Sequence, residues 1–159
     1  MAEAIISENL LGGAGGNVPT LQNHTTIIDA DGMYNTPPCW CIDSKGLKMQ
    51  WLVEDMGGLA AMKAHNEIKA AILYQYLDSQ EFYKAPVQKE YRSLMNVTFT
   101  SPSKELDDLF TAGVKEYNMV NLKGHRLVGG MRASIYNAMP IEGVETLVDY
   151  MKDFAKKHG

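Results

Sequence analysis

The sequence predicts an α+β fold, in which helices pack on a small and mostly antiparallel sheet. Three observations predict it. Apolar residues recur at helical spacing within residues 39–80 and again after Pro140, whereas apolar and polar residues alternate between positions 95 and 100. We therefore expect one long, bent helix followed by the element order β-α-β-β-α.

The first 38 residues predict an irregular arm. Residues 12–16 read G-G-A-G-G, which disfavours both helix and strand because glycine loses the most conformational freedom on ordering. We expect this arm to be a loop with one or two short extended pieces. Pro37 and Pro38 then fix the backbone, and helical periodicity begins after them.

A long, bent linking helix is expected over residues 39–80. Apolar residues between positions 42 and 52 can share one helical face, and the glycine pair at 57–58 provides a stop typical of a helix C-terminus. Apolar residues at i, i+4 spacing resume over residues 59–77. The glycine pair therefore joins the two helical stretches, which are expected to form one long, bent helix.

Residues 81–159 are expected to form a small α+β domain. The alternation at positions 95–100 is typical of a half-buried strand, and Ser101 with Pro102 reads as the N-cap and first residue of a helix. Two further strands are expected near residues 120–122 and 131–135, and a last helix is expected after Pro140.

Composition restricts the function classes. The formal net charge is −4, and the basic residues form no long stripe, which argues against a nucleic-acid partner. No apolar run approaches the length of a membrane span, and no signal-peptide pattern is evident, so we expect a cytoplasmic protein without a membrane partner. Cys39 and Cys41 form a single C-W-C without a second pair, which predicts reduced thiols and no metal site.

The segment K-G-H-R-L-V-G-G-M-R at residues 123–132 is the strongest candidate for a binding site. Arg126 and Arg132 provide planar forks that suit carboxylate or phosphate, and His125 can donate a further hydrogen bond. The alternative is a basic hairpin loop on a solvated surface. Asn35 and Thr36, before the two prolines, either form a turn that starts a helix or bind a phosphate through neutral donors.

Four motifs resemble one family, the phosphoserine aminotransferases. They are Y-N-T-P-P at residues 34–38, G-G-L-A-A-M at 57–62, Y-R-S-L-M-N-V-T-F at 91–99, and G-H-R-L-V-G-G-M-R-A-S-I-Y-N-A-M-P-I-E-G-V at 124–144. The last motif is highly specific, and a looser similarity extends back to residue 6. The resemblance therefore covers almost the whole chain.

The resemblance implies a homodimeric enzyme with an aspartate-aminotransferase-like fold that depends on pyridoxal phosphate. Such enzymes exchange an amino group between O-phosphoserine and 2-oxoglutarate in serine biosynthesis. Asn35 and Thr36 would then bind the phosphate of the cofactor held by the other subunit. His125 and Arg126 would bind the phosphate of the substrate, and Arg132 would bind its α-carboxylate.

The family's catalytic lysine lies in a motif Q-K-N-L/I-G-P-A-G that this sequence does not contain, and its first lysine is Lys45. Because that lysine holds the cofactor and carries a proton, we expect the chain alone to have no catalytic residue, no bound cofactor and no transaminase activity. It would then be the C-terminal portion of such an enzyme. The alternatives are a non-catalytic module that binds a phosphorylated amino acid, and an engineered scaffold without a ligand.

Overall fold

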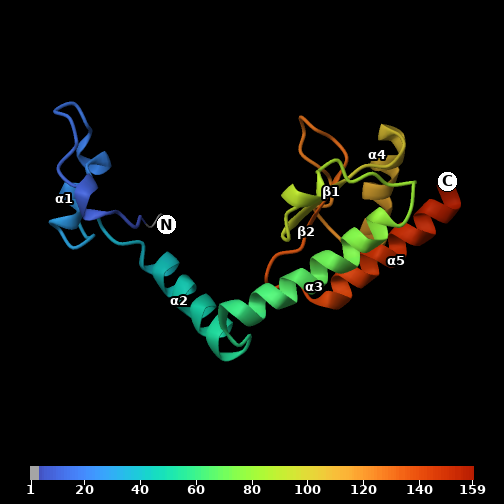
Figure 1. The fold of residues 1–159 in the computed structure, drawn as a ribbon, viewed down its shortest axis with the longest axis horizontal. Helices are drawn as coiled ribbons and strands as arrows, with labels where there is room; N and C mark the ends of the chain where they lie inside the picture. The colour runs from blue at the N-terminus through green and yellow to red at the C-terminus, as the bar shows by residue number, and fades with distance from the viewer. Residues whose placement is uncertain (1–3) are drawn as a thin grey trace. The chain divides into compact units, whose positions relative to one another are not determined.

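The structure is a computed structural model that describes residues 4–159, and these residues fall into two units that divide between Asp55 and Met56. Figure 1 shows the elements along the chain. The first unit contains the 3-10 helices η1 (Glu8–Leu10) and η2 (Thr20–Gln22), the short helix α1 (His24–Ile28) and the longer helix α2 (Cys39–Glu54). The second unit contains α3 (Gly58–Asp78), η3 (Lys89–Tyr91), β1 (Asn96–Phe99), α4 (Lys104–Gly113), η4 (Val114–Tyr117), β2 (Met131–Ser134) and α5 (Ile141–His158).

The N-terminal arm contains helical turns where the sequence predicted extended pieces. Asn23 caps α1, since its side chain accepts a hydrogen bond from the backbone N–H of Thr25 at 3.1 Å. Gly32, with φ +77°, ends the turn that follows, and its N–H donates to the carbonyl of Ile27 at 2.8 Å. No β-strand forms in the described part of the arm, and residues 1–3 lie outside the described residues.

The two expected helical stretches are present as α2 and α3. α2 begins after Pro38, and α3 begins after Gly57, which adopts the left-handed conformation at φ +75°. A left-handed residue cannot continue an α-helix, which explains why the helical pattern is interrupted here. The interpretation of residues 39–80 as one linking element stays a prediction, because the two units divide between these helices.

The sheet consists of β1 and β2, which pair antiparallel with Val97 opposite Ala133 and Thr98 opposite Arg132. The alternation predicted for β1 is confirmed, since Val97 and Phe99 are buried whereas Asn96 and Thr98 are half-buried.

The strand expected at residues 120–122 does not form as such. Residues 122–124 do lie against β2, where the N–H of Arg132 donates to the carbonyl of Leu122 at 2.7 Å. The ladder is reduced to an isolated bridge between Lys123 and Met131. Asn121 has φ +61°, and this left-handed residue turns the preceding chain away from the edge of β2.

The sequence predicted Ser101 as the N-cap of α4, but the structure shows Ser103 in that position. The Ser103 hydroxyl oxygen accepts from the N–H of Leu106 at 3.3 Å, and the helix begins at Lys104. Ser101 is instead bound to Asp107, whose carboxylate accepts from the Ser101 N–H at 2.8 Å and from its hydroxyl at 2.6 Å. The helix therefore starts two residues later than the sequence predicted.

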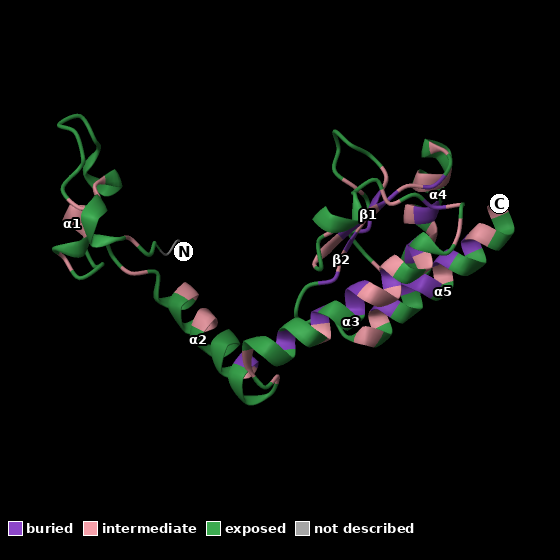
Figure 2. Cartoon of the chain, viewed as in Figure 1, coloured by how far each residue is buried: buried purple, intermediate pink, exposed green. Residues whose placement is uncertain are grey.

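The core of the second unit lies between the sheet, α3, α4 and α5 (Figure 2). Aromatic rings form its centre, with Phe110 in edge contact with Tyr83, Phe99 and Phe154 at centroid distances of 5.9, 5.9 and 5.2 Å. Tyr83 donates its hydroxyl to the carbonyl of Met151 at 3.0 Å, and burial raises the pKa of this phenol.

The C-terminal end of α3 is fixed by an ion pair. Asp78 accepts two hydrogen bonds from the guanidinium of Arg92, at 2.8 and 2.7 Å, and the same guanidinium lies 4.6 Å from the ring centroid of Tyr74. Lys89 adds a contact to the carboxylate at 3.0 Å. Hydrogen bonds from Arg92 and Lys89 hold the pKa of Asp78 well below its ordinary value.

Asp78→Asn should lower the free energy of unfolding at neutral pH by up to about 1 kcal/mol, because the bidentate pair is lost. The unfolded pKa of aspartate is about 3.9, so this stabilisation is fully present above that value and is lost as pH falls through the lower folded-state pKa. Urea denaturation of both proteins at neutral pH and at about pH 2 should show the difference shrinking in acid. Asp153→Asn is the control, since Asp153 is an exposed residue on α5. An effect of Asp78→Asn that does not depend on pH would contradict the ion-pair explanation.

Candidate functional site

The candidate segment at residues 123–132 forms a hairpin whose neck is made by two glycines. The N–H of Gly124 donates to the carbonyl of Gly130 at 2.8 Å. A Cβ added to Gly124 would lie 2.1 Å from the carbonyl oxygen of Gly129, and one added to Gly130 would lie 2.8 Å from that of Phe99. Side chains are therefore excluded from this neck, which brings the two sides of the hairpin together.

His125 begins the loop and organises its turn. Its carbonyl accepts from the N–H groups of Val128 and Gly129 at 2.9 and 2.8 Å, and its ring Nδ1 accepts from the N–H of Leu127 at 3.3 Å. An Nδ1 that accepts leaves the proton of the neutral ring on Nε2, which can then donate to a ligand. Arg126 follows on the exposed side of the same turn.

Arg132 lies on β2, two residues after the neck. Met131 and Ala133 point into the core, so Arg132 and Ser134 lie on the opposite face of the strand. The Nε of Arg132 is buried and has no hydrogen-bond partner. No carboxylate within residues 4–159 forms an ion pair with Arg126 or Arg132. An anionic ligand would supply the missing partner.

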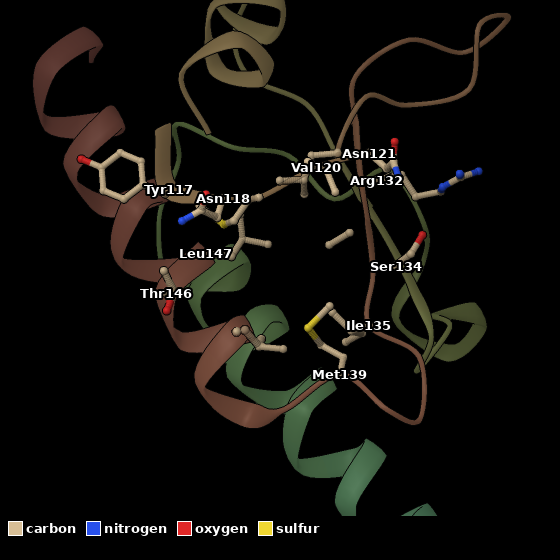
Figure 3. Close-up of a pocket in the computed structure, with 15 residues that line it drawn as sticks. Tyr117, Asn118, Val120, Asn121, Arg132, Ser134, Ile135, Met139, Thr146 and Leu147 are labelled. Atoms are coloured by element: carbon tan, nitrogen blue, oxygen red, sulfur yellow. The ribbon is translucent and has the colours of Figure 1, made fainter. Parts of the chain in front are cut away.

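A cavity of about 450 Å³ lies beside the free part of the β2 edge, between residues 117–122 and the start of α5. Its lining is mostly apolar, with Val120, Ile135, Met139 and Leu147 around it, and Figure 3 shows the guanidinium of Arg132 extending away from its centre. No pattern in the sequence predicts this cavity. The left-handed Asn121 that opens it gives no signal in the pattern of apolar residues.

The structure places the predicted residues in two groups. His125, Arg126 and Arg132 lie on one hairpin of the second unit, whereas Asn35 and Thr36 lie in the first unit. Asn35 and Thr36 are exposed and line a cavity of about 800 Å³ together with residues 37–39, and the Asn35 Oδ1 accepts from the Thr36 N–H at 2.9 Å. The amide nitrogen of Asn35 and the hydroxyl of Thr36 are therefore available as neutral donors.

Two properties of the described residues bear on other classes of site. Within residues 4–159, no group of three or more His, Cys, Asp or Glu side chains is arranged to hold a metal ion. None of the helices in this part of the chain combines the length and the apolar composition that a membrane span requires.

The chain belongs to the class-V aminotransferases, because a family model described as aminotransferase class-V matches residues 3–147. Its relatives within that family are phosphoserine aminotransferases, and the resemblance seen in the motifs is confirmed. One from Bacillus cereus is 49% identical over 151 residues, which are 95% of this chain and 42% of the relative. The one from Desulfatibacillum aliphaticivorans is 48% identical over 156 residues, which are 98% of this chain and 43% of the relative.

Solved structures agree with the sequence comparison. The phosphoserine aminotransferase from Bacillus circulans subsp. alkalophilus has a TM-score of 0.89 and 38% identity, over 96% of this chain and 42% of that chain. The PLP-bound enzyme from Trichomonas vaginalis has a TM-score of 0.80 and 36% identity, over 87% of this chain and 39% of that chain. The predicted α+β fold, as part of a PLP-dependent aminotransferase, is confirmed. The chain spans about 42% of the length of the curated relatives it matches.

Gly124→Ala should lower the free energy of unfolding by about 1–3 kcal/mol, because the new methyl group meets backbone oxygen at the hairpin neck. Chemical denaturation followed by circular dichroism measures the loss, and NMR shifts of residues 122–132 should locate it. Gly143→Ala on α5 is the control, since its close neighbour is the flexible side chain of Met139. Equal stability of the Gly124 variant and wild type would contradict the close approach.

Proposed function

We propose that this chain forms the C-terminal part of a phosphoserine aminotransferase and carries the residues that hold the substrate. The observation that carries the proposal is the hairpin of residues 123–132, which presents two arginines and a histidine without a carboxylate partner in the described part of the chain. The identity of 48–49% to phosphoserine aminotransferases supports it. The reaction proposed for the whole enzyme converts O-phosphoserine and 2-oxoglutarate into 3-phosphohydroxypyruvate and glutamate.

Each side chain has a distinct role in this proposal. The planar guanidinium of Arg132 binds the α-carboxylate of the substrate through two parallel hydrogen bonds. His125 and Arg126 bind the phosphate, the ring donating from Nε2 while Leu127 occupies Nδ1. A dianion and a carboxylate held at two points orient the amino group between them, which is the positioning that amino-group transfer requires.

Asn35 and Thr36 would hold the phosphate of pyridoxal phosphate in the other subunit of a homodimer. Their neutral donors fit a phosphate, and no Lys or Arg within residues 1–44 competes for this role. When bound, the cofactor supplies the electron sink that amino-group transfer needs. The cytoplasmic location and the dimer belong to this proposal as well.

Binding of a phosphorylated amino acid without turnover is the second candidate, and the unpaired arginines of the hairpin favour it over a scaffold without a ligand. Both readings place the ligand on the same residues. They differ in whether the bound ligand is turned over by a complete aminotransferase of which this chain is a part.

Arg132→Ala should weaken O-phosphoserine binding to the chain by about tenfold or more, since a charge-assisted bidentate contact is worth at least about 1.5 kcal/mol. Isothermal titration with O-phosphoserine, 2-oxoglutarate and inorganic phosphate would measure the loss. Lys123→Ala is the matched control, because this exposed lysine on the same hairpin makes only a 3.7 Å contact with Asp108. No binding of any of the three ligands by the wild-type chain would favour the scaffold.

The purified chain is expected to form no glutamate from O-phosphoserine and 2-oxoglutarate, even with added pyridoxal phosphate. The reason is that the family's lysine motif is absent from the sequence. The visible spectrum should also lack the band of a cofactor joined to a lysine, and a full-length relative serves as the positive control. Turnover by this chain that disappears in Lys45→Ala would overturn the expectation.

A further inference from the structure

Lys69, in the middle of α3, is fully buried, with none of its surface exposed. Its ammonium nitrogen lies 2.6 Å from the carbonyl oxygen of Tyr136 and 3.4 Å from those of Ile135 and Asn137. No carboxylate within residues 4–159 forms an ion pair with it. Burial accordingly lowers the pKa of this lysine.

A buried ammonium without a carboxylate is unfavourable unless its hydrogen bonds are satisfied, and removing it from water costs several kcal/mol. Methionine would fill nearly the same volume without that cost. Methionine cannot donate a hydrogen bond. The ammonium has three N–H donors, and three carbonyl oxygens lie around it. The contribution specific to Lys69 is therefore its hydrogen bonding to the backbone carbonyls of residues 135–137.

Residues 135–137 are the direct continuation of β2. The N–H of Ile135 donates to the carbonyl of Met95, which extends the pairing with the β1 side of the sheet by one step. Asn66 lies one turn before Lys69 on α3, and its side-chain amide donates to the Asn137 side chain at 2.8 Å. Asn66 is also buried, so α3 holds this segment with two polar side chains from inside the core.

Arg132 thus lies on a strand that is fixed at both ends. The glycine neck fixes the beginning of β2, and Lys69 with Asn66 fixes the chain that leaves it. Only two residues lie between Arg132 and Ile135, whose carbonyl is the first that Lys69 binds. The strand between them is extended and paired with β1, so a displacement at Ile135 also moves Arg132.

We infer that Lys69 and Asn66 are positioning residues for the Arg132 anion site, acting through the backbone of residues 135–137. This inference rests on the proposed function in one respect only, namely that Arg132 binds the substrate carboxylate. The alternative is that Lys69 contributes to the overall stability of the core without any specific effect on β2.

Amide hydrogen exchange of the full chain separates these two roles without any ligand. In Lys69→Met, the amides of Arg132 and Ile135, which donate to the carbonyls of Leu122 and Met95, should exchange about tenfold faster or more, while those of α5 near Met151 stay within about twofold of wild type. Lys63→Met is the control, since Lys63 lies on the same helix and is exposed. Equal acceleration at all core amides, or none at β2, would overturn the inference.

Should Lys69→Met fail to fold, Asn66→Leu tests the same segment with a smaller change. It removes the bond to Asn137 and should accelerate exchange at the amides of Arg132 and Ile135 by about threefold or more, with α5 again unchanged. Protection equal to wild type at these amides would overturn the inference.

A binding measurement then distinguishes this inference from the proposed function. If the wild-type chain binds O-phosphoserine, Lys69→Met should weaken binding by about tenfold while Lys63→Met leaves it unchanged. If the wild-type chain does not bind it, the proposed role of Arg132 fails, and the exchange pattern alone decides whether Lys69 positions β2. Unchanged binding together with unchanged exchange would exclude the positioning role.

Discussion

The register of β1 against β2 is the constraint on which the second unit depends. With Thr98 opposite Arg132, the alternation of side chains sends Val97 and Ala133 into the core and Arg132 to the other face. A slip of one residue would bury the guanidinium and expose the apolar residues of β2. The aromatic core and the candidate anion site are therefore opposite faces of one backbone arrangement, and neither can shift without the other.

Periodicity predicted α2, α3, α5 and β1, because these elements depend on neighbours within a few residues of one another. The start of α4 was not predictable in the same way. Ser101 and Ser103 carry the same hydroxyl, and the choice between them is decided by Asp107, which binds Ser101 and leaves Ser103 to cap the helix. α1 was missed because a helix of five residues is too short to show a repeat.

The candidate site was partly predictable, because part of it also depends on residues that are close together in the sequence. His125, Arg126 and Arg132 stand close in the sequence between glycines, so a hairpin that presents them was a natural expectation. The cavity beside β2 was not predictable from the sequence. Nor was the burial of Lys69, since Lys69 and the carbonyls it binds are 66–68 positions apart. A lysine in an amphipathic helix is normally expected at the solvated face, and only the tertiary fold brings those carbonyls to it.

The division into two units also decides what optical spectroscopy can observe. Both tryptophans, Trp40 and Trp51, lie in α2 of the first unit, and Trp40 is largely exposed. Seven of the eight tyrosines lie in the second unit, where Tyr83 and Tyr150 pack into the aromatic core. Tryptophan fluorescence therefore reports the unfolding of the first unit alone. Near-ultraviolet dichroism of the tyrosines follows the packing of the second unit, so the two signals give independent unfolding curves without any added label.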